Sequence, residues 1–325
     1  MAHKLNGTPT IIPIASGKGG VGKTFFTANL AIALAEMGHP TIAVDADLGG
    51  SNLHFSLGLP NRFPGIGSFL KARSAELEEM LVTTEIPNLY FLPGDGTSPF
   101  MANISHAQKI RLISRIVNLP AEYILLDLGA GTSFNTLDFF RLSQHGLVIT
   151  TPEYPAIMNM MTFLKHFLLR IITGNFTKNN NISQMLHAMY KTDKQINIIE
   201  LQERIGNIDH EAGNKVRELC RQYRPRLVFN MGEHPDEIKL SEQIDNNLMN
   251  ILSMEVDYFG FIFNDPAVRQ SIKDKMPFIP CNRKTMTTKN IEHIATRIVK
   301  YWNKPIDKSA QRLLNHTRKA YENHI

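Results

Sequence analysis

Near its amino terminus the chain reads IIPIASGKGGVGKT from Ile11 to Thr24, an apolar run that leads into the phosphate-loop pattern G-x-x-x-x-G-K-T. In this pattern Lys23 reaches the β- and γ-phosphates of a nucleotide, and the Thr24 hydroxyl is a ligand for Mg²⁺. Four glycines let backbone N–H groups turn inward around phosphate oxygens: Gly17, Gly19, Gly20 and Gly22. A helix predicted at residues 26–37 completes a strand–loop–helix unit. The stretch therefore predicts a site for a nucleoside triphosphate with Mg²⁺.

The composition is that of an ordinary globular protein. The chain has 325 residues, of which 43% are hydrophobic and 20% are charged. No run of 18 or more apolar residues and no signal-peptide pattern is present, so we expect a cytoplasmic location. Cys220 and Cys281 lie far apart, and the 12 histidines are scattered, which argues against a disulfide framework and a cysteine or histidine metal site. A net charge of +5 permits weak attraction to nucleic acid or acidic lipid but does not choose between them.

Further apolar runs alternate with helical stretches, and this alternation decides the fold class. The runs occupy residues 41–44, 88–92, 123–126, 147–150, 227–229 and 256–263. They predict an α/β fold with a mostly parallel, twisted sheet and helices on both faces. We expect a single domain over residues 1–303, a polar helical insertion at about 170–225, and a basic tail or helix at 304–325.

Carboxylates follow two of these runs. Asp45 and Asp47 come after the second run and before Gly49-Gly50, and the alternation of a strand predicts that both point to one side. Asp127 ends the run at 123–126 and is followed by two glycines. Ligands of parallel sheets bind at the carboxyl ends of the strands, so we expect these three carboxylates to lie beside the phosphate loop.

Lys18 makes the loop unusual, because the string from Lys18 to Thr24 reads KGGVGKT. It resembles the deviant Walker A motif of the MinD/ParA family. The resemblance implies that Lys18 reaches across a homodimer to the partner subunit's ATP, an electrostatic role similar to that of an arginine finger. It also implies that Asp47 orients the attacking water, that Asp45 supports Lys23 and the magnesium shell, and that Asp127 holds Mg²⁺.

The remaining site predictions come from the same resemblance. The metal site would comprise Thr24, Asp47 and Asp127, and the catalytic residues would be Lys18, Lys23 and Asp47. Asn230 and Asp265 follow later strands and resemble the family's base-recognition residues, although a turn asparagine and a helix-capping aspartate are the plain alternatives. The full nucleotide-binding set is Gly17, Lys18, Gly19, Gly20, Val21, Gly22, Lys23, Thr24, Phe25, Asn230 and Asp265.

Within the family, the segment Asp47-Leu48-Gly49, with Asn52-Leu53 and Leu57-Gly58-Leu59 after it, is most similar to MinD and the flagellar-number regulator FlhG. This similarity implies an ATPase that dimerises with ATP, hydrolyses it slowly under the control of an activating partner, and sets the placement or number of a structure such as the flagellum or division site. The switch sequence from Asp127 to Gly131 reads DLGAG, where relatives often carry two alanines or prolines before the last glycine. A ParA-like ATPase on nucleoid DNA and a non-hydrolysing ATP-dependent adaptor are the alternatives.

The sequence does not decide the role of two segments. Met158, Met160 and Met161 belong to a helix predicted at 154–169, where they form either core or a partner-binding face. In the tail, apolar residues from Ala310 to Ile325 fall near helical spacing, but the apolar face is thin. Peripheral contact with the membrane, docking onto the protein and a solvated tail all fit this pattern.

Overall fold

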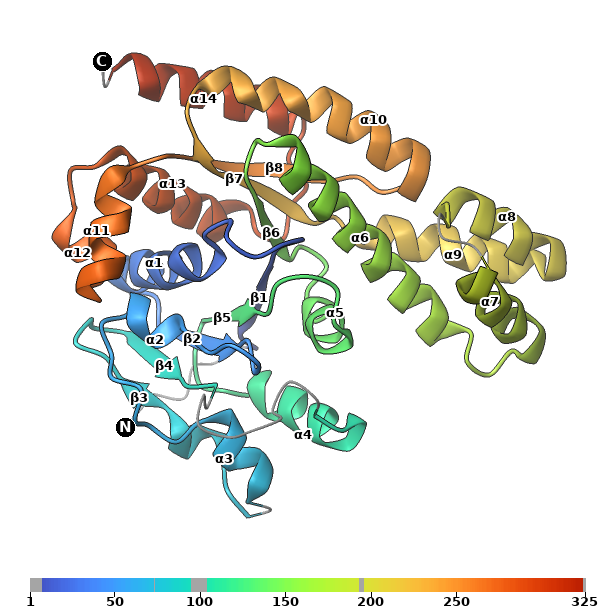
Figure 1. The fold of residues 1–325 in the computed structure, drawn as a ribbon, viewed down its shortest axis with the longest axis horizontal. Coiled ribbons are helices and arrows are strands. Elements are labelled where there is room, and N and C mark those ends of the chain that lie inside the picture. Colours follow the sequence, from blue (N-terminus) through green and yellow to red (C-terminus); the bar gives the residue numbers. More distant parts are fainter. Residues whose placement is uncertain (1–7, 73, 95–103, 193–195, 324–325) are drawn as a thin grey trace.

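The computed structural model of the chain describes residues 8–72, 74–94, 104–192 and 196–323. Its centre is a sheet of eight strands in the order β3-β4-β2-β5-β1-β6-β7-β8 (Figure 1). Neighbouring strands run parallel except for the antiparallel pair β3 and β4. The strands are β1 (Thr10–Ala15), β2 (Thr41–Ala46), β3 (Val82–Thr83), β4 (Leu89–Leu92), β5 (Tyr123–Leu128), β6 (Leu147–Thr150), β7 (Arg226–Gly232) and β8 (Asp257–Phe263). The predicted α/β fold is confirmed, and only the two-residue edge strand β3 was not predicted, because it is too short to show a pattern.

The sheet is buried on both faces, which explains why its strands read as continuous apolar runs. Along β5, Leu125 belongs to one hydrophobic core, and Ile124 and Leu126 belong to the other. The first core includes residues of α1 (Lys23–Glu36), α12 (Phe278–Cys281) and α13 (Met286–Tyr301). The second includes residues of α4 (His106–Ile116), α5 (Phe134–Phe140), α6 (Tyr154–Asn175) and α10 (Ser241–Leu252). Helices therefore cover both faces, as predicted.

The segment between β6 and β7 is helical. The 22-residue helix α6 continues to Asn175, six residues past its predicted end, and three further helices follow it: α7 (Asn180–Thr192), α8 (Ile198–Ile208) and α9 (His210–Gln222). Figure 1 shows α6 running from the sheet toward α7, α8 and α9, which lie together at one end of the molecule. Met160 and Met161 are buried, whereas Met158 is 41% exposed, so most of the predicted methionine face is core.

The carboxyl-terminal helix α14 (Ser309–Glu322) packs on the protein itself. Leu313 and Leu314 are buried in the same core as α6, and the ring of Tyr321 stacks on Phe263 at 5.5 Å. Arg318 pairs with Asp236 in η3 (Pro235–Leu240) at 2.5 Å. The thin apolar face is thus occupied by β8 and η3, which favours the docking alternative over contact with a membrane through this face.

The remaining elements are short helices that lie along the chain between the elements named above. They are α2 (Leu53–Ser56), α3 (Ile66–Lys71), η1 (Leu77–Met80) and α11 (Pro266–Asp274). In the part of the chain that the structure describes, no helix combines the length and the apolar character needed to cross a membrane.

Candidate nucleotide-binding site

The phosphate loop occupies the middle of the sheet, because β1 lies between β5 and β6. Gly20 and Gly22 have φ angles of +85° and +79°, a left-handed backbone that favours glycine. Helix α1 begins at Lys23, three residues before its predicted start, because Gly22 ends the loop and the helix follows at once. The first N–H groups of α1 and the positive end of its dipole therefore lie at the loop, where they favour an anion.

Lys23 and Asp127 meet at the base of this loop. The Lys23 ammonium lies 2.7 Å from Asp127 Oδ1, and both side chains are buried, with 8% and 1% of their surfaces exposed. The Thr27 hydroxyl, one helical turn after Lys23, donates to the same oxygen at 3.0 Å. The structure thus brings two predicted site residues into contact. It adds a third residue to this contact, Thr27, which the sequence analysis did not predict. The only feature of the sequence that could have indicated Thr27 is its position four residues after Lys23.

Asp45 and Asp47 have different surroundings although they are two residues apart. Asp45 pairs in register with Asp127 on the adjacent strand, and its Oδ2 accepts from the N–H of Leu53 at 3.1 Å. Burial, together with the charge of Asp127, raises the pKa of Asp45 to about 7. Asp47 lies half-buried just past β2, against Gly129: a Cβ on that glycine would lie 3.2 Å from Asp47 Oδ1. Asp45 therefore fixes the start of α2, and Asp47 faces the segment after Asp127.

Two contacts tie the phosphate loop to neighbouring segments. A Cβ on Gly17 would lie 2.2 Å from the backbone carbonyl carbon of Asn159, so this glycine permits close approach of α6. The N–H of Gly131 donates to the carbonyl of Ser16 at 3.0 Å, and the Ser16 hydroxyl donates to the carbonyl of Lys18 at 2.9 Å. Lys18 is half-buried at the loop. These contacts connect the loop with α6 and with the segment after β5.

Asn230 lies at the loop, and Asp265 caps a helix. The Asn230 amide donates to the carbonyl of Val21 at 2.8 Å and is buried against Gly22. Asp265 Oδ1 accepts from the N–H of Ala267 at 2.9 Å and so caps α11, the plain alternative that the sequence left open. The Phe25 side chain is buried edge-to-face on Phe278, so any contact of Phe25 with a nucleotide would come from its backbone.

The residues present fit a nucleotide with Mg²⁺. A Cβ on Gly19 or Gly20 would meet nothing within 4 Å, so these loop residues face open space. Among the described residues, no three His, Cys, Asp or Glu side chains gather into a group that could hold a metal ion. This is consistent with Mg²⁺ in phosphate-loop proteins, which is held by one or two carboxylates, a hydroxyl such as that of Thr24, and phosphate oxygens.

A mostly parallel sheet with this loop after its central strand defines a P-loop nucleotide-binding protein. The sequence matches the family described as the CobQ/CobB/MinD/ParA nucleotide binding domain over residues 12–278. The chain belongs to this family, which confirms the resemblance seen in the KGGVGKT string.

Individual relatives point to one part of the family. The chain is 39% identical over 150 residues to a putative septum site-determining protein MinD of Guillardia theta, across 45% of this chain and 54% of the relative. It is 34% identical over 161 residues to the flagellum site-determining protein YlxH of Helicobacter pylori, across 49% of this chain and 54% of that one. The chain spans about half the length of the curated relatives it matches.

Solved structures support the fold. A septum site-determining protein MinD from Pyrococcus horikoshii, complexed with Mg-ADP, superposes with a TM-score of 0.60 at 20% identity, over 91% of this chain and 98% of that chain. MinD in a MinC:MinD complex from Aquifex aeolicus gives a TM-score of 0.59 at 22% identity, over 92% of this chain and 98% of that one. At these identities the likeness establishes the shared fold.

Proposed function

We propose that the protein is an ATPase of the MinD/FlhG type that dimerises with ATP and controls the placement or number of a cellular structure, such as the flagellum or the division site. The observation that carries the proposal is the buried Lys23–Asp127 pair beneath a loop that also bears Lys18. The relatives named for septum and flagellum placement support this choice of branch.

The proposed mechanism gives each side chain one task. Lys23 and the N–H groups of the loop hold the β- and γ-phosphates, and Asp47 orients the attacking water beside Gly129. Mg²⁺, held by Thr24 and Asp127 with Asp47 nearby, would neutralise charge on the phosphate oxygens. Lys18 completes the site of the partner subunit, so turnover depends on dimerisation. A metal-bound MinD structure, the complex with Mg-ADP, supports the magnesium role.

Lys18 provides the test of the proposal. Light scattering with size-exclusion chromatography would compare the wild type, Lys18→Ala and the exposed-surface control Lys178→Ala, each with ATP and with ADP. We expect ATP-dependent dimers and phosphate release for the wild type and Lys178→Ala, and monomers without turnover for Lys18→Ala. The proposal is rejected if Lys18→Ala dimerises and hydrolyses ATP as the wild type does.

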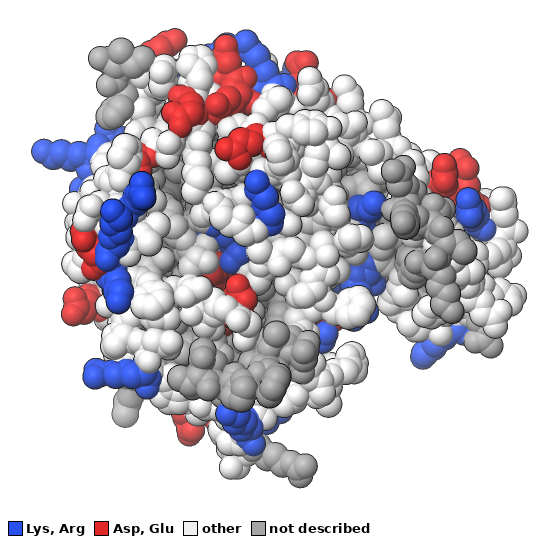
Figure 2. Space-filling model, in the orientation of Figure 1, with Lys and Arg blue, Asp and Glu red and all other residues white. Residues whose placement is uncertain are grey.

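The same samples separate the two alternatives. A non-hydrolysing adaptor would bind ATP and dimerise but release no phosphate, with or without a partner. A ParA-like protein would associate with duplex DNA in an ATP-dependent and salt-dependent manner. On the face that Figure 2 shows, the described lysine and arginine side chains are interspersed with carboxylates instead of forming a continuous stripe. We favour the MinD/FlhG type because relatives named for septum and flagellum placement match the chain.

A further inference from the structure

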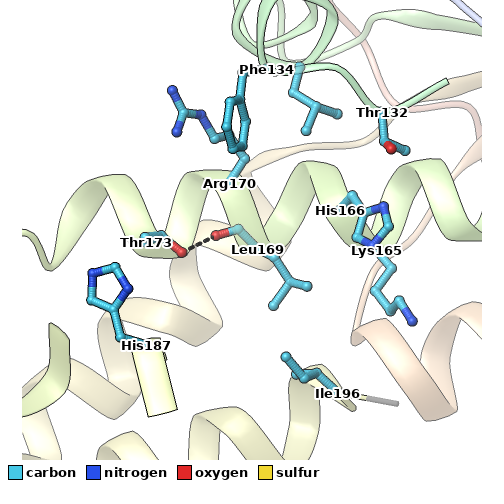
Figure 3. A pocket seen from close by; sticks show the side chains of 10 residues that line it. Thr132, Phe134, Lys165, His166, Leu169, Arg170, Thr173, His187 and Ile196 are labelled. Atoms are coloured by element: carbon cyan, nitrogen blue, oxygen red, sulfur yellow. Dashed lines mark hydrogen bonds between the residues drawn. The ribbon is translucent and has the colours of Figure 1, made fainter. Parts of the chain in front are cut away.

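A cavity of about 560 Å³ lies between α5, α6 and α7, and none of its lining residues belongs to the phosphate loop. In Figure 3, α6 crosses the view, with Phe134 of α5 above it and His187 of α7 and Ile196 below it. The volume is within the range of roughly 300–1,000 Å³ that is typical of small-molecule sites. The cavity is therefore large enough for a ligand.

One part of the lining is apolar. Leu137 and Leu169 are buried, with 3% and 8% of their surfaces exposed, and Ile196 is buried at 7%. Phe134 is 67% exposed, an unusual position for a phenylalanine, and its ring contributes to the cavity wall. A ligand that covers this ring and these aliphatic side chains would remove apolar surface from water, which favours binding.

The other part of the lining is basic. Lys165, His166, Arg170 and His187 line the cavity, and none of the lining residues that the structure describes is a carboxylate. The His166 Nδ1 atom is buried without a hydrogen-bond partner in the described part of the chain. Burial and the charge of Lys165 lower the pKa of His166, so Lys165 and Arg170 carry the positive charge of this lining. The arrangement attracts an anionic group and repels a cationic one.

Arg170 is held in place by Asp138, so it is part of the wall and is not a free anchor. Its guanidinium makes two hydrogen bonds of 2.9 Å to Asp138 and lies 4.7 Å from the centre of the Phe134 ring. Lys109 also donates to Asp138, at 2.5 Å. Burial raises the pKa of Asp138, but the hydrogen bonds from Arg170 and Lys109 outweigh it and hold the pKa below its usual value. The cluster of two cations and one carboxylate keeps a net positive charge, and Lys165 adds another.

The cavity also touches the segment that leads away from the phosphate loop. Thr132 lines the cavity and directly follows Gly131, whose N–H donates to Ser16 of the loop at 3.0 Å. On its other side the cavity is walled by α6, whose backbone lies against Gly17. A ligand in the cavity would therefore contact both elements that hold the phosphate loop.

We propose that this cavity binds a small anionic amphiphile, a molecule with one carboxylate-like head and an apolar body, and that its occupancy changes the affinity for nucleotide. The head lies toward Lys165, and the apolar body covers Leu169 and Phe134 and extends toward His187, which Figure 3 shows on the opposite side of the cavity from Lys165. Coupling between two sites is reciprocal, so nucleotide changes the affinity for the amphiphile by the same factor.

The binding step is tested without any nucleotide, so its result is independent of the proposed ATPase function. Isothermal titration calorimetry on the full chain would use decanoate below its micelle concentration, with decanol as the uncharged probe. Lys165→Ala removes the anchor of the head, His187→Ala changes the opposite side of the cavity, and Lys178→Ala removes an exposed lysine outside the cavity. Thermal unfolding of each variant checks that it is folded.

We expect saturable binding of one decanoate, weaker binding of decanol, a loss of about fivefold or more in affinity for Lys165→Ala, and a smaller loss for His187→Ala. Lys178→Ala should bind like the wild type. The proposed binding site is wrong if decanoate does not bind, or if all three folded variants bind decanoate equally. The coupling is tested by titrating a fluorescent ADP analogue with and without saturating decanoate, and an unchanged ADP affinity would overturn it.

Discussion

The Lys23 ammonium lies 2.7 Å from the Asp127 carboxylate, although 104 residues separate the two in the chain. One belongs to the first turn of α1 and the other to β5, so the pair joins the loop to the adjacent strand. Both groups are removed from water, and each therefore depends on the other for compensation of its charge. The same pair therefore contributes to the stability of the fold and forms part of the candidate nucleotide-binding site.

Removing one member of this pair should destabilise the protein even without nucleotide. For Lys23→Met we expect the free energy of unfolding to fall by about 3 kcal/mol, because Asp127 is left as an uncompensated buried charge. The double variant Lys23→Met/Asp127→Asn should be more stable than Lys23→Met, since it removes that charge. Urea denaturation of both variants and of Asp127→Asn completes a double-mutant cycle, and simple additivity of the two changes would contradict the coupling.

Gly17 and Gly19 offer a matched pair of substitutions within one loop. Gly17→Ala places a methyl group 2.2 Å from the backbone of Asn159, so the phosphate loop or α6 must move, and we expect a loss of roughly 2–3 kcal/mol of stability. Gly19→Ala meets nothing within 4 Å and should change stability by less than about 0.5 kcal/mol. Thermal unfolding without nucleotide measures both, and equal effects would show that packing on α6 is not what requires Gly17.

A substitution of Asn230 can show whether this residue stabilises the phosphate loop or recognises the base of the nucleotide. Its amide donates to Val21 at 2.8 Å, so Asn230→Ala should weaken ATP and GTP alike, by about fivefold, through a less ordered loop. Asn264→Ala, an exposed asparagine after β8, is the control. Titration with fluorescent analogues of both nucleotides gives the two affinities. A change in the ratio of ATP to GTP affinity would instead support base recognition.

The elements that the sequence predicted well are those whose conformation is determined by residues close together in the chain. An apolar run, glycines and a lysine in series determine β1, the loop and the start of α1, and they need no distant partner. The strand positions followed from burial on both faces, which leaves a continuous apolar run in the sequence. Asp127 could be placed at the site because the carboxyl ends of parallel strands share one edge of the sheet.

The features that the sequence did not predict depend on tertiary contacts. Thr27 is an ordinary helix residue until β5 brings Asp127 within 3.0 Å of it. Gly17 was predicted only as a phosphate-binding glycine, whereas its contact with Asn159 depends on the path of α6. The apolar residues of α14 have the same spacing whether they face lipid or protein, so only the packing of Leu313 and Tyr321 could decide between the two.

His293 of α13 and His316 of α14 form a stacked pair, with ring centroids 3.9 Å apart, and we expect this pair to make the packing of α14 sensitive to acid. Burial, together with His316, Arg297 and Lys300, lowers the pKa of His293 to about 4. Burial, with Arg297 and Lys319, lowers the pKa of His316 as well. The unfolded chain takes up protons near pH 6.5, whereas the folded protein binds the His293 proton only near pH 4.

Between these two pH values the two histidines bind more protons in the unfolded state, so their contribution to the free energy of unfolding should fall as the pH falls from 6.5 toward 4. His293→Gln removes the buried group that resists protonation, and we expect its unfolding free energy to depend less steeply on pH than that of the wild type over this range. His210→Gln, at an exposed histidine, should keep the wild-type slope. Urea denaturation at pH 6.5, 5.5 and 4.5 gives the three slopes. If His293→Gln and the wild type lose stability in parallel, the acid sensitivity lies elsewhere in the protein and not in the contact between α13 and α14.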